Sequence, residues 1–248
     1  MQDRGLRIIK IVIWTATIVA IASVAAAIGS GFGHSAGLWH YRFGFTLLRW
    51  SSYITAGAGT VALLGGVLAV IGRLRGHALA GFFSAALALA LVVPAWELQQ
   101  TAKEVPRIHD ITTDTEHPPR FVALLPVRQT TANGPEYGGE EIAREQKAAY
   151  PEIAPALLKE PPARAFEQAL AAARSLGWEI VAAVPAEGRI EATDTTRWFR
   201  FKDDVVIRVT PNGAGSRIDV RSKSRVGRGD VGTNAKRISA YLRALRKV

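Results

Sequence analysis

Apolar residues form three long runs in the first part of the chain. The runs cover residues 8–28, 52–71 and 78–96; small or hydroxyl residues occur within each, Lys10 lies near the start of the first, and Pro94 lies near the end of the third. A helix rises about 1.5 Å per residue, so runs of this length match a hydrocarbon layer of roughly 30 Å. The pattern therefore predicts a transmembrane region over residues 1–97 with three helices.

Basic residues beside these runs predict their orientation. Arg4, Arg7 and Lys10 lie at the start of the first run, and Arg73 and Arg75 lie in the short loop between the second and third. The positive-inside rule places both groups in the cytoplasm. The N-terminus is then cytoplasmic, and the chain after the third run lies outside.

The first run has a second interpretation. A basic start, an apolar run and the alanines at 25–27 are also typical of a cleavable signal peptide, and cleavage would leave two spans and the same outside C-terminus. We favour a retained helix because the run is long for a signal sequence. The second and third runs contain no charged residue, which argues against an ion or proton pathway.

Residues 98–162 contain many prolines. Proline disfavours long helices and interior strands, but apolar pieces such as residues 121–125 persist. We expect an extended segment that packs on the domain after it, with its most mobile loop at residues 130–139.

Regular periodicity returns over residues 163–248. An amphipathic helix follows Ala163 and is expected to end at Gly177, and apolar positions from Ala235 to Leu245 predict a last helix. Between them, alternation predicts an antiparallel meander of strands at residues 178–184, 190–192, 198–201, 205–209 and 218–220, with Asp203 and Asp204 in a turn. The predicted fold class is α+β, a two-layer domain with two helices on one face of the sheet.

Composition and charge narrow the chemistry. The chain has no cysteine, which excludes disulfides and thiolate metal sites, and its five histidines form no helical i, i+4 pair. No metal site and no cofactor is predicted. The net charge is +10, and residues 192–248 hold fourteen basic residues against five acids. Such basicity is typical of nucleic-acid binding, but a location outside the membrane argues against nucleic acid.

The C-terminal basic charge gathers on one sheet face and in one turn. Arg208 and Arg217 would project from the last strands toward the face without helices. A glycine-rich turn then leads into the last helix, where backbone N–H groups and the helix dipole favour an anion. The candidate anion-binding residues are Arg221, Ser222, Lys223, Ser224, Arg225, Arg228, Asp230 and Asn234.

Less specific interpretations of these residues stay open. Asp230 or Thr233 would equally serve as a helix cap, and a strand face of this kind can simply be solvated and screened by salt. If the basic face is covered, three partners fit: anionic lipid headgroups, an acidic polymer of the envelope, or the acids of the proline-rich segment, namely Glu136, Glu140, Glu141 and Glu145.

Several motifs in order resemble a known family. They are residues 111–114 with the prolines at 118–119, then residues 150–153, 177–179, 189–193, 198–199, 204–208 and 222–234. Over about residues 105–247 the chain resembles the bacterial and plastid family catalogued as domain of unknown function 1499. The resemblance implies a secreted or membrane-anchored envelope domain. Three preceding helices resemble the proteobacterial version, which implies the bacterial inner membrane with a periplasmic C-terminal domain. It implies no reaction, cofactor or catalytic residue.

Three functions fit these observations. We favour a non-enzymatic, membrane-anchored periplasmic module that binds an anionic or amphiphilic ligand or a partner protein. The first alternative is a structural partner of other integral membrane proteins, with helix contacts at small residues such as Ala62 and Gly66. The second is an envelope enzyme with Asp203, Asp204, Asp230 or Glu191 as acid or base, although we assign no catalytic residue. The bilayer itself is the remaining predicted partner.

Overall fold

The computed structural model describes residues 2–247, and for residues 2 and 3 it describes the backbone alone. The chain divides into two compact units. The first comprises residues up to 100 together with 198–200, and the second comprises residues 101–197 together with those from 201 onward. We call them the helical unit and the α+β unit and describe each by itself.

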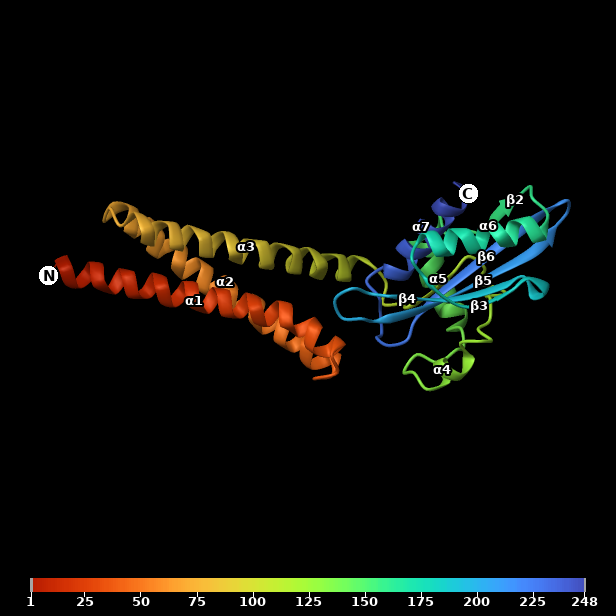
Figure 1. Ribbon diagram of the computed structural model, residues 1–248, viewed down its shortest axis with the longest axis horizontal. Helices are drawn as coiled ribbons and strands as arrows, with labels where there is room; N and C mark the ends of the chain where they lie inside the picture. The colour runs from red at the N-terminus through yellow and green to blue at the C-terminus, as the bar shows by residue number, and fades with distance from the viewer. Residues whose placement is uncertain (1, 248) are drawn as a thin grey trace. The chain divides into compact units, whose positions relative to one another are not determined.

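The helical unit consists of α1 (Gln2–Ser35), α2 (Tyr41–Ile71) and α3 (Arg75–Glu104), all visible in Figure 1. The described residues include three helices that are long and apolar enough to cross a membrane, which confirms the predicted number. The helices extend beyond the apolar runs, because backbone hydrogen bonding continues past the apolar stretch. α2 begins at Tyr41, where the ring of His40 accepts a hydrogen bond from the Arg42 N–H, and α3 continues past Pro94.

Small residues let the three helices approach closely. A Cβ atom on Gly81 of α3 would lie 2.7 Å from the Gly66 Cα of α2, and one on Gly65 would lie 2.6 Å from the Ile13 Cγ1 of α1. The Ser84 hydroxyl of α3 also donates to Thr17 Oγ1 of α1, at 2.8 Å. Ala62 and Gly66, which the sequence offered for contacts with other membrane proteins, are buried here in the contact between α2 and α3.

The α+β unit contains one antiparallel sheet in the order β1-β6-β5-β4-β3, with β2 also paired to β6. Strands β3 to β6 are consecutive neighbours, so they form the predicted meander, whereas β1 and β2 come from the proline-rich segment. The strands are β1 (Asp110–Thr112), β2 (Ala156–Leu158), β3 (Glu179–Val184), β4 (Arg189–Thr195), β5 (Lys202–Asn212) and β6 (Gly215–Ser224); the helices are α4 (Leu125–Gln129), α5 (Gly139–Ala149), α6 (Pro162–Ser175) and α7 (Thr233–Leu245), and a short 3-10 turn, η1, covers Pro185–Glu187.

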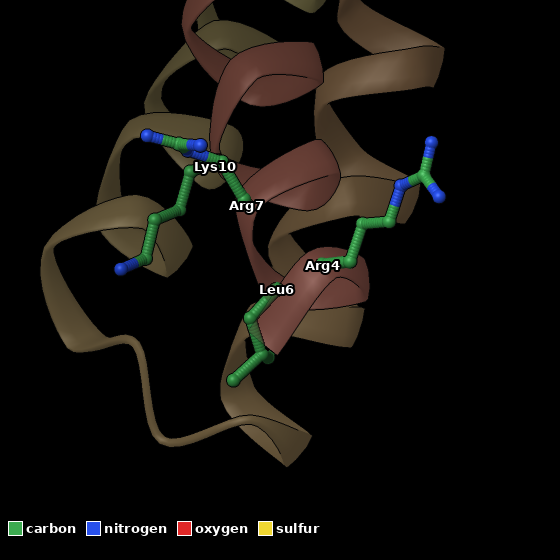
Figure 2. Close-up of a pocket in the computed structure, with 4 residues that line it drawn as sticks. All are labelled: Arg4, Leu6, Arg7 and Lys10. Atoms are coloured by element: carbon green, nitrogen blue, oxygen red, sulfur yellow. The ribbon is translucent and has the colours of Figure 1, made fainter. Parts of the chain in front are cut away.

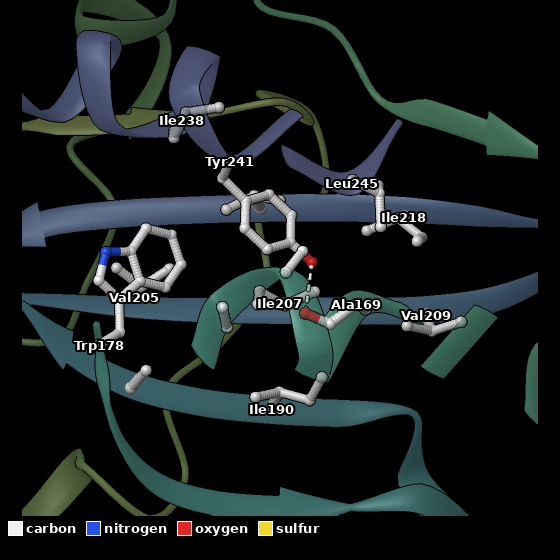
Figure 3. Close-up of a cluster of buried hydrophobic side chains, with 14 of the residues drawn as sticks. Ala169, Trp178, Ile190, Val205, Ile207, Val209, Ile218, Ile238, Tyr241 and Leu245 are labelled. Carbon is white, nitrogen blue, oxygen red and sulfur yellow. Dashed lines mark hydrogen bonds between the residues drawn. The ribbon is translucent and has the colours of Figure 1, made fainter. Parts of the chain in front are cut away.

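The core of the α+β unit lies between one sheet face and the helices α6 and α7 (Figure 3). Alternation along β4, β5 and β6 turns Ile190, Ile207 and Ile218 toward the helices, where each is fully buried. Tyr241 of α7 stacks on Trp178 with ring centroids 5.4 Å apart and donates its hydroxyl to the Ala169 carbonyl of α6, at 3.1 Å. The predicted α+β class is confirmed.

Two local predictions in the meander are wrong. Residues 198–201 form the connection between β4 and β5 instead of a strand, closed by hydrogen bonds between Thr196 and Phe201. Asp203 and Asp204 lie within β5, paired with Ser224 and Lys223, instead of in a turn. Aromatic residues favour strands and acidic pairs favour turns by propensity, but here buried arginines neutralise both aspartates inside the sheet.

The proline-rich segment is more regular than the predicted extended chain. Its stretch between Pro135 and Pro151 has no proline, and α5 forms there. The segment also supplies β1, β2 and α4, and it places Ile108, Ile111 and Ile153 in the core. This proline-free stretch is long enough for a helix and was the signal for α5. The high proline density of the whole segment obscured that signal.

Candidate functional site

The sheet face opposite α6 and α7 carries mostly polar and charged side chains. The register pairs Asp204 with Lys223, Val206 with Arg221 and Arg208 with Asp219 across β5 and β6. Side chains directly opposite in register share a face. We call this surface the polar face; its polar members are Arg189, Glu191, Thr193, Asp204, Arg208, Arg217, Asp219, Arg221 and Lys223.

Arg221 is neutralised within the protein. Its guanidinium binds both carboxylate oxygens of Asp110, at 2.9 and 2.8 Å, and also donates to the carbonyls of Pro119 and Pro135. Only 2% of Arg221 is exposed. Tyr137 lies beside it, with its ring centroid 5.5 Å from the guanidinium carbon, and burial raises the pKa of Tyr137 to about 12. Asp110 and two backbone carbonyls therefore engage the buried guanidinium, which leaves Arg221 without direct contact to an external anion.

Lys223 shares the same carboxylate. Its Nζ lies 3.1 Å from Asp110 Oδ2 and donates to the carbonyl of Glu136. Burial lowers the pKa of Lys223, although the Asp110 carboxylate opposes that shift. The proline-rich segment therefore covers the basic face, as one of the three partner hypotheses stated. The neutralising acid is Asp110, whereas the hypothesis named Glu136 and the acids of α5.

A second ion cluster centres on Asp204. Arg128 of α4 donates to Asp204 Oδ2 and Arg225 donates to Asp204 Oδ1, each at 2.8 Å, while the Thr193 hydroxyl also bonds Oδ1. Burial lowers the pKa of Arg128 despite this carboxylate. The guanidinium carbon of Arg128 lies 4.8 Å from the ring centroid of Phe121. Sequence reasoning missed Arg128, because a single arginine in a proline-rich segment gives no periodic signal.

The third cluster lies at the more exposed end of the polar face. Arg208 and Arg217 each bond both Asp114 and Asp219, with N–O distances of 2.9 to 3.0 Å for the closest contacts. Partial burial acts to raise the pKa of Asp114, but backbone N–H donors, chiefly that of His117, and the two arginines outweigh it, so the pKa is lowered. Arg208 and Arg217 project toward this face as predicted, already paired with acids.

Ser222 and Ser224 point to the opposite side of β6. The Ser222 hydroxyl donates to Asn234 Oδ1 at 2.6 Å, and Asn234 Nδ2 donates to Ser224 Oγ at 2.9 Å. Arg237 of α7 joins this network and pairs with Asp203 at 2.7 Å. Strand alternation thus places Arg221 and Lys223 on one sheet face and Ser222 and Ser224 on the other, and of the eight candidate anion-binding residues only Arg228 is exposed.

Asp230 serves as a cap for α7. Its Oδ1 accepts from the Gly232 N–H and its Oδ2 from the Asn234 N–H, both at 2.8 Å. Burial raises the pKa of Asp230, while these N–H donors oppose the shift. The neighbouring Val231 has a φ of 54°, a left-handed conformation unusual for a β-branched residue. The helix-cap interpretation of this turn therefore describes its geometry better than an open anion site.

The four candidate catalytic carboxylates all have structural partners. Asp203 and Asp204 face opposite sides of the sheet and pair with different arginines. Glu191 is completely buried, pairs with Arg189, and accepts hydrogen bonds from three consecutive N–H groups, of Val122, Ala123 and Leu124, at 2.8 to 3.0 Å. Because Asp230 caps α7, each of the four carboxylates is thus engaged by arginines or by backbone N–H groups.

The helical unit contains a hollow between α2 and α3. A space of about 290 Å³ lies between α2 and α3, with Arg49, Ser52 and Tyr53 on one side and Trp96 and Gln99 on the other. A second space of about 180 Å³ shares Ala56 and Val92 with it and continues along the same helices. We call the two together the α2–α3 groove. Sequence reasoning missed it, because its residues are interleaved at helical spacing on two helices.

Three membrane-length helices followed by a two-layer unit with an internally neutralised polar face define a membrane-associated α+β protein. Residues 110–245, more than half of the chain, match the family model described as protein of unknown function DUF1499. The chain therefore belongs to this family, which confirms the resemblance seen in its motifs. No curated protein matches the chain.

Two solved structures are similar to part of the chain. Protein CV1439 from Chromobacterium violaceum is 16% identical, with a TM-score of 0.29, over 38% of this chain and 93% of that one. TTHA0849 from Thermus thermophilus is 13% identical, with a TM-score of 0.25, over 38% and 92%. Neither similarity is close enough to carry an argument about this chain.

Proposed function

We propose that the protein is a non-enzymatic, membrane-anchored binding protein of the bacterial inner membrane whose ligand is an amphiphile held in the α2–α3 groove. The groove itself is the observation that carries the proposal. It combines one basic and several polar side chains at one end with small and apolar side chains along the rest. This arrangement matches a molecule with a polar head and a hydrocarbon tail.

The polar end of the groove suits a headgroup. Arg49 is exposed, and no ion pair to it is found in the described part of the chain. Gln99 adds an amide, and the exposed rings of Tyr53 and Trp96 flank the opening. Tyr and Trp are characteristic of the membrane–water interface, so an anionic or zwitterionic headgroup bound at Arg49 would lie at headgroup depth.

The rest of the groove suits a hydrocarbon chain. Its narrow part is lined by Gly59, Ala85 and Ala88, with leucines beside them. The hydroxyls of Ser52 and Thr60 donate to the carbonyls four residues earlier, so they do not demand a polar ligand. Along α2 the lining runs from residue 45 to residue 63, about 27 Å of helix. One leaflet contributes roughly half of the 30 Å hydrocarbon layer. The groove is therefore long enough to hold a lipid chain across one leaflet.

The α+β unit supports a binding role over an enzymatic one. Its candidate carboxylates and most of its candidate anion-binding residues are engaged with one another, as described above.

In this proposal the α+β unit lies in the periplasm, the N-terminus lies in the cytoplasm, and the polar end of the groove lies near the outer surface. The orientation rests on Arg73 and Arg75 between α2 and α3 and on the positive-inside rule. Nucleic acid is not expected as a partner at this location.

Assembly with other integral membrane proteins is the second candidate. The observation in its favour is the large apolar surface of the helices, including Leu64, Leu79 and Leu89, each more than half exposed. Lipid tails satisfy such a surface equally well. A specific groove is therefore the better guide to function than total apolar area.

Mass spectrometry of the intact protein, released from nanodiscs with a mild detergent, tests the proposal. Ala56 lines both spaces, so Ala56→Leu fills the groove, whereas Gly57→Leu places the same side chain where a Cβ meets nothing within 4 Å. We expect a discrete amphiphile adduct in the wild type and in Gly57→Leu, and at least a tenfold loss in Ala56→Leu. A wild type without an adduct, or equal retention in both variants, would contradict the proposal.

The headgroup contact has its own pair of variants. Arg49→Gln removes the basic group from the groove, and Arg42→Gln removes an exposed arginine from the same helix outside it. Hydrogen bonds to charged groups contribute about 1.5–3 kcal/mol, so we expect retention of the adduct to fall about tenfold or more in Arg49→Gln alone. Equal adduct loss in both would assign the effect to general surface charge.

A further inference from the structure

The α2–α3 turn forms a second, separate hollow at the other end of the same helices. We infer that this hollow binds an anionic phospholipid, with the lipid phosphate held by Arg73 and Arg75. The inference goes beyond the proposed function, because none of the residues that line this hollow lines the α2–α3 groove. It concerns a different ligand site and stands or fails independently.

The hollow combines two cations with an apolar wall. Its volume is about 640 Å³, and Arg73 and Arg75 line it together with Val70, Leu79 and Phe82. Leu79 is 70% exposed and Phe82 is 42% exposed. Both follow the arginines along the first turns of α3, so the surface changes from cationic to apolar within a few residues. A phospholipid has the same sequence of chemistry, from an anionic phosphate to acyl chains.

The turn that carries Arg73 has a defined conformation. The N–H of Arg73 donates to the Val70 carbonyl at 3.0 Å, and the N–H of Leu74 donates to the Ala69 carbonyl at 2.8 Å. Arg73 itself has a φ of 55°. That left-handed region is unfavourable for residues with a Cβ, yet position 73 carries arginine. Because these two hydrogen bonds define the turn, the guanidinium of Arg73 extends from an ordered backbone.

The start of α1 adds cations at the same end. Figure 2 shows that Arg7 and Lys10 extend to one side of α1 and Arg4 to the other. These residues and Leu6 line a space of about 540 Å³. Leu6 of α1 contacts the α2–α3 turn, because its Cδ2 lies 3.1 Å from the position of a Cβ on Gly72. The first turns of α1 therefore lie beside the turn.

Asp3 is the single acid beside these cations in the sequence, so acids do not balance their charge. The sequence contains five Lys or Arg residues at this end of the unit, and residues 4–96 contain no Asp or Glu. Five like charges repel one another unless anions lie among them. Basic residues near a membrane surface attract anionic lipid headgroups. The structure assigns the counter-charge to phospholipid phosphates, with the clearest single position between Arg73 and Arg75.

The test compares lipid classes on the full-length protein. The protein is reconstituted in nanodiscs of phosphatidylethanolamine that contain phosphatidylglycerol. Mass spectrometry of the released protein then identifies and quantifies the lipids that it retains. Arg75→Gln and the double variant Arg73→Gln/Arg75→Gln are compared with Arg42→Gln, which removes one charge from a helix position outside the hollow. Because residue 75 lies within α3, we expect Arg75→Gln to preserve the conformation of residue 73.

We expect the wild type and Arg42→Gln to retain phosphatidylglycerol in preference to phosphatidylethanolamine, and Arg75→Gln to lose about tenfold of that retention. The double variant should lose the preference completely. Equal retention in Arg75→Gln and Arg42→Gln would overturn the inference. Inorganic phosphate at about 10 mM serves as a competing probe. Displacement of the lipid by this phosphate would also overturn the inference and would assign the site to free anions.

The groove variant separates this inference from the proposed function. Ala56→Leu should leave the Arg75-dependent retention of phosphatidylglycerol unchanged, because Ala56 lines only the α2–α3 groove. Loss of that retention in Ala56→Leu would show that both sets of variants report one site, and the inference of a separate site would be wrong.

Discussion

Arg128 and Asp204 form an ion pair, with 2.8 Å between the guanidinium Nη1 and the carboxylate Oδ2, in which neither side chain is exposed. The two residues are far apart in the sequence, and the pair fastens α4 and the proline-rich segment to the centre of the sheet. A buried ion pair adds little folding stability beyond that of a well-packed apolar pair. Loss of one partner is strongly destabilising, because it leaves an uncompensated charge in a medium of low polarity. The segment and the sheet should therefore be stable only together.

The first prediction follows from this pair. Asp204→Asn removes the charge that Arg128 and Arg225 share, and we expect the free energy of unfolding of the α+β unit to fall by about 3–5 kcal/mol. Hydrogen exchange of peptides from β5 and β6 across a urea series measures the change. Glu167→Gln is the control, because its pair with Arg164 is exposed and should contribute at most about 1 kcal/mol. Similar losses in both variants would contradict this account of the polar face.

The second prediction concerns Arg221. Under the anion-site interpretation, Arg221→Glu would abolish binding and leave the fold intact. The structure predicts the opposite, because the new carboxylate would lie beside Asp110 in a site that is 2% exposed. We expect Arg221→Glu to yield little folded protein, whereas Arg228→Glu, at the exposed position of the same turn, should fold normally. Circular dichroism and proteolysis of both variants check this, and a stable Arg221→Glu variant would contradict it.

The third prediction is a dependence on pH. The pKa of Asp114 is lowered from its usual value of 3.8 in the folded state. The unfolded state therefore binds the proton more readily, and the stabilisation present above about pH 4 is lost as the pH falls through the folded-state pKa. Asp114→Asn should flatten the acid limb of the stability curve and lower stability at neutral pH. Chemical unfolding between about pH 2 and pH 7 measures both, and identical acid limbs would contradict the role of Asp114.

The fourth prediction tests the close approach of α2 and α3. A Cβ at Gly81 would overlap the Ala62 carbonyl oxygen, so Gly81→Ala should force the helices apart and destabilise the helical unit by about 1–3 kcal/mol. Gly57→Ala meets nothing and should be neutral or slightly stabilising, since alanine favours helix. Thermal unfolding in detergent compares the two. Equal melting temperatures would show that the helices do not depend on this contact.

The overall architecture could be predicted from the sequence because it depends on periodic patterns. Long apolar runs marked the helices of the helical unit, and alternation marked the positions that Ile190, Ile207 and Ile218 occupy in the core. The failures have a common cause. Asp203 and Asp204 look like turn residues until their arginine partners are known, and those partners lie at distant positions of the chain that no local pattern connects.

The candidate site was the least predictable part for the same reason. A run of Arg, Ser and Lys at 221–225 reads as one basic patch, yet strand alternation sends its members to two faces, and acids from elsewhere neutralise them. Ion pairing is a property of the folded chain, whereas charge is a property of the sequence. The α2–α3 groove depends likewise on how two helices pack, which small residues permit but do not specify.

In the proposed function an amphiphile occupies the α2–α3 groove. The most direct test of this occupancy is photolabelling of the protein in nanodiscs with a phospholipid that carries a diazirine on its acyl chain, followed by mapping of the labelled residues by peptide mass spectrometry. We expect labels to concentrate at Gly59, Ala85 and Val92, well above the exposed Leu64 and Val67 of α2. Labels distributed in proportion to exposure, with Leu64 and Val67 labelled most, would contradict it.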